Sequence, residues 1–172
     1  SLGQYAEAVA QYGQCLEVFE AQGYTQGIAV TKTNLGYLAW KLGRLEEAER
    51  YSLEALEIKR QMGDRRGRAV TLCNLGEICL SGRELGRSRG YFLEALELTL
   101  AGKWATTLTE VLAGLSELSL QQGDALLAAQ LAQTVNTHPS SSDSAKARVL
   151  PLLRQLDAPL PSLEQLLAAL TP

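Results

Sequence analysis

Hydrophobic and small side chains recur along the chain with the period of an α-helix. In the stretch 71–80, the i, i+3, i+4 and i+7 positions of one helical face are Leu72, Leu75, Gly76 and Cys79. The chain is rich in Leu, Ala and Glu, which favour helix, and no stretch alternates β-branched and polar residues as a half-buried strand does. The pattern therefore predicts an all-α fold, with helices over 4–21, 26–41, 45–61, 66–81, 85–101, 105–121 and 125–137 and two shorter ones near 143–156 and 163–170.

The helical pattern itself repeats every forty residues. The octet YSLEALEI at 51–58 returns as YFLEALEL at 91–98, and Leu35, Leu75 and Leu115 occupy one shared column. A single pair of helices this small cannot bury its apolar face, whereas stacked pairs bury a continuous core. We therefore predict a repeat array over residues 1–137, with units starting near 3, 43, 83 and 123 and the first helix of the first unit absent. Residues 138–172 lose the register and are expected to form capping helices.

These columns resemble the tetratricopeptide repeat motif, which has Leu-Gly in its first helix, then a small residue, and two alanines in its second helix. The matching residues are Leu35, Gly36, Ala39, Ala48 and Ala55, then Leu75, Gly76, Cys79, Ser88 and Ala95, with a weaker third copy at Leu115, Ser116, Ser119 and Ala128. The forty-residue period looks more like the kinesin light chain and Pins-type class, and bacterial signalling-ATPase and LuxR-type regulators carry similar arrays. The resemblance covers residues 3–137. It implies a right-handed superhelical solenoid of antiparallel helix pairs, with about seven to nine helices and a concave groove that binds protein or peptide.

Composition and charge narrow the classes of function. The formal net charge of −3 over 172 residues gives no overall attraction for nucleic acid. No apolar run reaches the ~18 residues that span a bilayer. Three cysteines are an odd number and too few for a disulfide scaffold, and the first residues carry no signal-peptide pattern. We therefore expect a cytoplasmic protein with neither nucleic acid nor membrane as a partner.

The chain opens on residues that match the second helix of a unit. YAEAVAQYGQCLEVFE at 5–20 aligns with LEEAERYSLEALEIKR at 45–60. Without a first helix beside it, its apolar face, including Val9, Leu16 or Phe19, is expected to be partly open, and open apolar faces attract partners. We therefore predict self-association through this N-terminal helix, or coverage of its face by another molecule.

Residues able to carry chemistry are scarce. The single histidine, His138, stands in the turn-like segment THPSSS, with no nucleophile or orienting group patterned around it. Cys73 and Cys79 lie six residues apart, a spacing that fits no zinc site and turns them in different directions on a helix. No glycine-rich phosphate loop is present. The sequence thus predicts a protein that is not an enzyme, with no catalytic residues, no cofactor and no metal.

One basic cluster stands out, consisting of Lys59, Arg60, Arg65, Arg66 and Arg68. It could form a patch for phosphate or an acidic peptide. However, the corresponding loops of the other units carry almost no charge, so the basic stripe does not continue along the array. We therefore interpret the cluster as a solvated loop.

The first helix of each unit would present a second set of residues to the concave groove. These positions differ among units whereas the core columns agree, as expected of a shared scaffold with a partner-specific surface. The candidate peptide-binding residues are Asn34, Tyr37, Trp40, Lys41, Asn74, Glu77, Glu110 and Glu117. They would suit an extended peptide that brings an apolar residue to the aromatic pair and Lys or Arg to the glutamates.

Asn34 and Asn74 are identical and forty residues apart. Because an amide both donates and accepts hydrogen bonds, a ladder of amides can hold a peptide backbone whatever its side chains. Alternatively, each asparagine bonds within its own repeat. The sequence leaves both interpretations open.

The last part of the chain also has two interpretations. Pro151 should kink or end its helix, and Ser162 with Gln165 forms a capping-box start for LEQLLAAL. These helices either cap the array or serve in dimerisation or docking. For the whole chain we expect a scaffold that binds protein or peptide. The alternative is a sensor or regulatory domain of a larger signalling ATPase or transcriptional regulator.

Overall fold

The computed structural model describes residues 2–155 and Leu170 and confirms the predicted all-α fold. Its helices are α1 (Leu2–Gln22), α2 (Thr25–Lys41), α3 (Leu45–Gln61), α4 (Arg65–Ser81), α5 (Leu85–Gly102), α6 (Ala105–Gln121), α7 (Ala125–Thr137) and α8 (Asp143–Gln155). These bounds agree with the predicted ones to within two residues, and no strand occurs in the described residues. The helix expected near 163–170 lies outside the described residues except for Leu170, which is buried.

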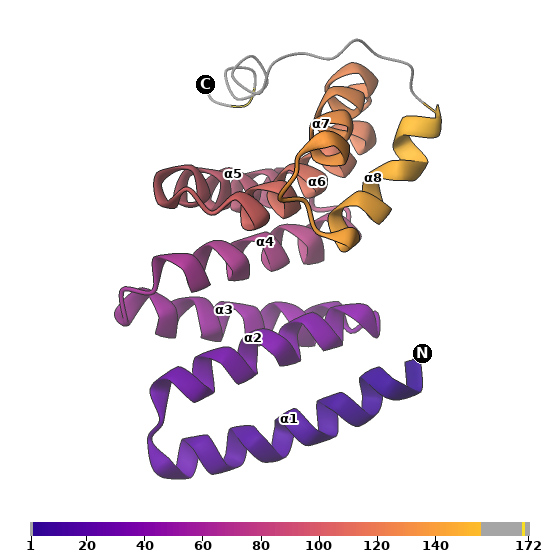
Figure 1. Cartoon of the computed structure of the whole chain (residues 1–172). Helices are drawn as coiled ribbons and strands as arrows, with labels where there is room; N and C mark the ends of the chain where they lie inside the picture. The colour runs from indigo at the N-terminus through magenta and orange to yellow at the C-terminus, as the bar shows by residue number, and fades with distance from the viewer. Residues whose placement is uncertain (1, 156–169, 171–172) are drawn as a thin grey trace.

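The helices stack in chain order into a solenoid, as Figure 1 shows. The two helices of each pair, α2 with α3, α4 with α5 and α6 with α7, pack against each other, and each pair packs on the next. The predicted core column is buried, with Leu35, Leu75 and Leu115 each at most 2% exposed. At the end of the stack, α8 packs against α7 and α6.

Every twentieth residue from 23 to 123 has a left-handed backbone and lies where a helix ends. Four of these residues are Gly23, Gly43, Gly63 and Gly123, and the other two are Arg83 (φ 59°) and Lys103 (φ 55°). At Gly43, the backbone N–H donates to the Trp40 carbonyl oxygen at 2.9 Å and closes the end of α2. The forty-residue register aligns Arg83 with these glycines, and the structure confirms that Arg83 takes the left-handed conformation although Gly82 is adjacent.

The helices of a pair cross so closely that the crossing point requires a small residue. A Cβ atom added at Gly36 would lie 3.1 Å from the carbonyl oxygen of Ala48 in the facing helix. In the third pair, Ser116 stands at the equivalent place, and its Oγ donates to the Ala128 carbonyl oxygen at 2.8 Å. The small columns of the repeat therefore set how near the paired helices approach.

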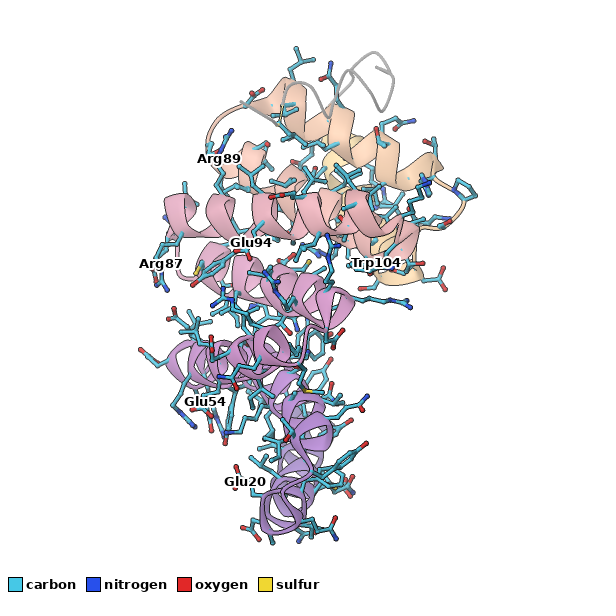
Figure 2. All side chains as sticks on the ribbon, turned by 90° about the vertical axis from the view of Figure 1, so that its left-hand side faces the viewer. Glu20, Glu54, Arg87, Arg89, Glu94 and Trp104 are labelled. Atoms are coloured by element: carbon cyan, nitrogen blue, oxygen red, sulfur yellow. The ribbon has the colours of Figure 1, made fainter. Side chains whose placement is uncertain are left out.

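Ion pairs also join neighbouring helices. Lys32 Nζ lies 2.6 Å from Glu54 Oε2 across α2 and α3, and Arg68 Nη2 lies 3.2 Å from Glu94 Oε1 across α4 and α5. Figure 2 shows Glu54, Arg87 and Glu94 spread along the stack. Because partly exposed pairs contribute at most about 1 kcal/mol each, they add little to the stability that the core supplies.

α1 is less well covered than the later helices. Cys15 is exposed, whereas Ala55 and Ala95, which stand in the same column of later units, are 0% exposed. Val18 is 51% exposed. The three apolar residues predicted to form its open face are half-buried: Val9, Leu16 and Phe19. The face is thus partly open, and self-association through it stays a prediction.

Candidate partner-binding groove

A cavity of about 300 Å³ lies between α2, α4, α6 and α8. Its lining consists of Tyr37, Trp40, Lys41, Val70, Cys73, Asn74, Glu77, Thr106, Thr107, Glu110, Ser144 and Arg148. Six of the eight residues predicted for the groove are in this list. Of the remaining two, Asn34 lines a separate hollow between α1 and α2, and Glu117 accepts a hydrogen bond from Arg148.

Aromatic rings and an ammonium group form one end of the cavity. The rings of Tyr37 and Trp40 lie 5.8 Å apart between centroids in an edge-to-face arrangement. Lys41 Nζ lies 3.8 Å from the centroid of the Trp40 ring, within cation–π distance. Burial lowers the pKa of the Lys41 ammonium, and the charge of Arg148 lowers it further. This end therefore combines an apolar surface with a partly desolvated cation.

Asn34 and Asn74 are half-buried on α2 and α4. Within the described part of the chain, neither side chain makes a hydrogen bond to another residue of the protein. By contrast, Trp40 Nε1 donates to Ser81 Oγ at 2.8 Å, so other polar groups of this face are satisfied internally. The described residues offer neither asparagine a side-chain hydrogen bond that would give it a structural role. Asn74 lines the cavity, and Asn34 lines the hollow between α1 and α2.

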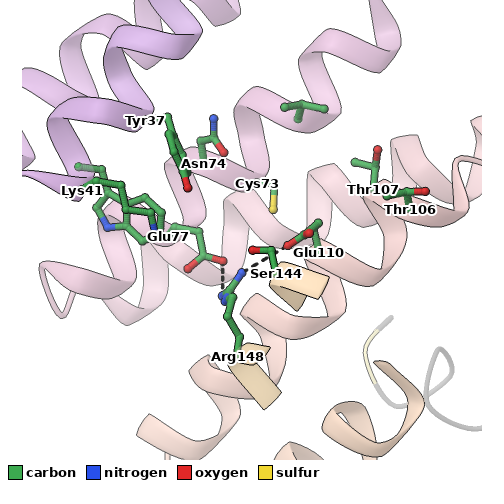
Figure 3. A pocket seen from close by; sticks show the side chains of 12 residues that line it. Tyr37, Lys41, Cys73, Asn74, Glu77, Thr106, Thr107, Glu110, Ser144 and Arg148 are labelled. Carbon is green, nitrogen blue, oxygen red and sulfur yellow. Dashed lines mark hydrogen bonds and ion pairs between the residues drawn. The ribbon is translucent and has the colours of Figure 1, made fainter. Parts of the chain in front are cut away.

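Three glutamates surround a guanidinium group at the other end, as Figure 3 shows in part. Arg148, on α8, donates from Nη2 to Glu77 Oε1 at 2.5 Å and from Nε to Glu117 Oε1 at 2.8 Å. Its Nη1 lies 3.8 Å from Glu110 Oε2, and Ser142 Oγ donates to the other oxygen of Glu110. We call Glu77, Glu110 and Glu117 the acidic cage. The positive group that the sequence analysis assigned to a partner is here supplied by the chain itself.

The acidic cage is partly desolvated, and this changes its proton affinity. Glu77 is only 5% exposed, and burial raises the pKa of its carboxyl to about 7 although Arg148 opposes that shift. Burial alone would lower the pKa of the Arg148 guanidinium, but Glu77 and Glu117 raise it above its ordinary value. The guanidinium is therefore permanently charged, and Glu77 is the group whose proton occupancy changes near neutral pH.

Arg148 is the residue that the sequence analysis missed. The forty-residue register ends before α8, so no column predicts which of its residues faces the groove. Ser144 and Arg148 are four residues apart and share one helical face, and both line the cavity. That spacing is the only feature of the sequence that indicates a shared face of α8, and it does not predict that Arg148 contacts the glutamates on α4 and α6.

The structure also corrects the interpretation of the basic cluster at 59–68. Arg60, Arg65 and Arg66 are exposed as predicted, but Lys59 is only 5% exposed. Its Nζ donates to Thr33 Oγ1 at 2.6 Å and Thr71 Oγ1 at 2.8 Å. Lys59 lies near the end of α3, and its long apolar stem lets the ammonium reach between α2 and α4. The position of Lys59 near a helix end did not indicate this burial.

Other side chains that could carry chemistry are one histidine and two cysteines. His138 is half-buried, and its Nδ1 accepts from the backbone N–H of Ser140 at 3.1 Å. Cys73 and Cys79 are buried free thiols. Within residues 2–155 and 170, no group of three or more His, Cys, Asp or Glu side chains could hold a metal ion. In the same residues, no helix has the length and apolar character needed to cross a membrane.

Comparisons with known proteins agree with this geometry. A family model described as tetratricopeptide repeat matches residues 1–61 and, overlapping them, 27–101. The chain belongs to the tetratricopeptide repeat family, whose repeats generally mediate protein–protein interactions and typically serve as non-enzymatic scaffolds. No curated protein matches the chain significantly.

Among solved structures, the crystal structure of BtubC (BKLC) from P. vanneervenii is similar to this chain. It matches with a TM-score of 0.64 and 23% sequence identity over 98% of this chain. The chain spans 64% of the length of that structure. At this identity the similarity shows the fold alone.

Proposed function

We propose that the chain binds an extended segment of a partner protein along α2, α4 and α6, from the hollow between α1 and α2 that Asn34 lines to the cavity that Asn74 lines. The observation that carries this proposal is the pair Asn34 and Asn74, two half-buried amides in repeat register whose hydrogen-bonding groups no described residue uses. A peptide backbone presents alternating N–H and C=O groups, which such amides satisfy. An apolar side chain of the partner would lie against Tyr37 and Trp40, next to the Lys41 ammonium.

The proposal predicts separate effects of groove and core substitutions. Changing Asn34 or Asn74 to Ala removes one or two hydrogen bonds to the ligand, so affinity falls on the order of tenfold at each site. Folding changes by less than about 0.5 kcal/mol, because no bond within the described protein is lost. The partner is first isolated by affinity capture and mass spectrometry, and the binding segment is then titrated calorimetrically against each variant.

Two controls make this test decisive. Asn136→Ala removes a half-buried amide on α7 that does not line the cavity, and it should leave affinity unchanged. Leu75→Ala empties a fully buried core position and should cost roughly 2–5 kcal/mol of stability. Suppose the asparagine variants lose stability as Leu75→Ala does while affinity per folded molecule is intact. In that case the asparagines are structural and the groove proposal is wrong.

A sensor or regulatory role within a larger signalling protein stays the alternative prediction. It would use the same groove for a small effector or for another part of the parent protein. A full-length sequence that carries a nucleotide-binding or DNA-binding domain would favour it over a stand-alone scaffold.

A further inference from the structure

We propose that the acidic cage is a guanidinium-binding site of the groove and that α8 occupies it as an internal ligand. A partner segment that carries an arginine then competes with Arg148 for the same three carboxylates. This inference rests on the proposed function of the groove, because it assigns the chemistry of one end of the bound segment.

The shape of the contact matches a planar guanidinium. Glu77 and Glu117 stand forty residues apart in the repeat register, on α4 and α6, and they hold two different nitrogens of one guanidinium. Glu110 faces a third nitrogen of the same group. A planar guanidinium has five N–H donors in a fixed fork, whereas a lysine ammonium is a compact point charge. The cage therefore selects arginine over lysine.

The Arg148 side chain can leave the cage without unfolding its helix. α8 is held by apolar contacts of Ala145, Val149 and Leu152, which are at most 8% exposed. The Arg148 side chain is 22% exposed and lines the cavity beside the cage. For a second guanidinium to enter, the Arg148 side chain has to rotate toward solvent. Because the apolar contacts of α8 do not involve this side chain, we expect the backbone of α8 to stay in place.

The charge of the acidic cage also favours a cationic occupant. Three carboxylates surround one guanidinium, and the Glu77 carboxylate is nearly inaccessible to water. An ionised carboxylate in such a place needs a cation, so loss of Arg148 from the cage favours its replacement by another cation or the protonation of Glu77. The exchange is therefore a substitution of one guanidinium for another. An arginine on the partner is the chemistry that meets this demand.

Titration of the full chain with N-acetyl-arginine amide at pH 8 tests the proposal without any partner. The variant Arg148→Ala, with an empty cage, should bind this probe at least tenfold more tightly than the wild type, whose own arginine competes at the high effective concentration of a tethered group. N-acetyl-citrulline amide, which has the same shape without the charge, should not bind. Binding is followed by calorimetry and by backbone amide shifts of Glu77, Glu110 and Glu117.

Two more variants guard against effects on folding. Arg154→Ala removes an exposed arginine from the same helix and should bind the probe no better than the wild type. Arg148→Lys keeps a cation in the cage but cannot span three carboxylates, so its affinity for the probe should lie between those of the wild type and Arg148→Ala. If Arg148→Ala unfolds, a gain of affinity in Arg148→Lys still supports the proposal.

The proposal is overturned if neither Arg148 variant binds the arginine probe more tightly than the wild type. It is also overturned if citrulline amide binds as well as arginine amide. The cage would then be a structural clamp that only fixes α8. That result would leave the groove function intact, since the Asn34 and Asn74 substitutions test it with the partner itself.

Discussion

Lys59 and Glu77 are equally buried, at 5% exposure each, but only one of the two charges has a counter-ion. Glu77 receives a guanidinium from Arg148 at 2.5 Å. Lys59 receives only neutral oxygens, from Thr33, Thr71 and, at 3.4 Å, the Gly67 carbonyl. No carboxylate of the described residues lies within ion-pair distance of its ammonium.

Burial shifts the pKa of both groups toward the neutral form, against an adjacent guanidinium for Glu77 and against only a more distant carboxylate for Lys59. Burial lowers the pKa of the Lys59 ammonium to about 8, and the more distant Asp64 only partly opposes it. The ammonium can therefore shed its proton at mildly alkaline pH, since its oxygen neighbours also suit a neutral amine. The charge of the Glu77 carboxylate is compensated by one partner, the Arg148 guanidinium on α8. A buried charge with a counter-ion joins two helices, but both groups make stability depend on pH, because burial shifts the pKa of each toward its neutral form.

The largest effect is expected when the Glu77 pair is broken. Arg148→Ala leaves a buried carboxylate without its cation and should cost about 3–5 kcal/mol of unfolding free energy at pH 8, measured by urea denaturation. The double variant Arg148→Ala, Glu77→Gln should recover much of that loss. A single variant as stable as the wild type would show that the pair does not hold α8 to the array.

An intermediate effect is expected from pH acting on Lys59. The folded pKa of about 8 lies below the ordinary 10.5, so between these values the unfolded chain binds more protons. Stability should therefore rise from pH 8 to 10.5, by on the order of 3 kcal/mol, relative to the variant Lys59→Met. Denaturation midpoints of the two proteins across this range measure the difference.

The comparison with Lys59→Met is clean because the neighbouring hydroxyls keep other bonds. Thr33 Oγ1 also donates to the Ala29 carbonyl oxygen at 2.8 Å, and Thr71 Oγ1 to that of Gly67 at 2.9 Å. Parallel pH profiles for the wild type and the methionine variant would show that the buried ammonium does not titrate in this window.

The smallest effect near neutral pH is expected for Glu77→Gln, which keeps the shape and one acceptor for Arg148. Near pH 7 it should cost about 1 kcal/mol, the worth of one hydrogen bond. The raised pKa of Glu77, about 7 against the ordinary 4.5, means that the folded chain binds more protons between these values. Wild-type stability should thus fall from pH 4.5 to 7 relative to Glu77→Gln, and thermal melts that show no such fall would contradict the assignment.

Much of the fold follows from local features of the sequence. The forty-residue columns place Leu35, Leu75 and Leu115 in the core, and the structure confirms all three. Helix bounds agree because glycines or their register equivalents end the helices at regular intervals. Periodicity over a few turns determines these features, since a helical face repeats every three to four residues and the repeat copies it.

The candidate site was predictable only in part. The spacing within the first helices brings Tyr37, Lys41 and Asn74 to one cavity, because they follow the register of the array. The burial of Glu77 was not predictable, since its column position is the same as that of Glu117, which remains half-buried. Whether a groove residue is covered depends on what packs over it, and α8 belongs to no column.

The sequence by itself determined the repeat, its helices, its core columns and the face that forms the groove, since each depends on contacts between residues near in the chain or forty apart. The tertiary structure alone decided how the two charges are buried. Arg148 meets Glu77 across 71 residues of chain because the stack brings α8 beside α4 and α6. Lys59 is buried because its stem spans the junction of three helices. Both contacts join side chains from helices that only the packing of the stack brings together, and the helical pattern of a single segment does not encode that packing.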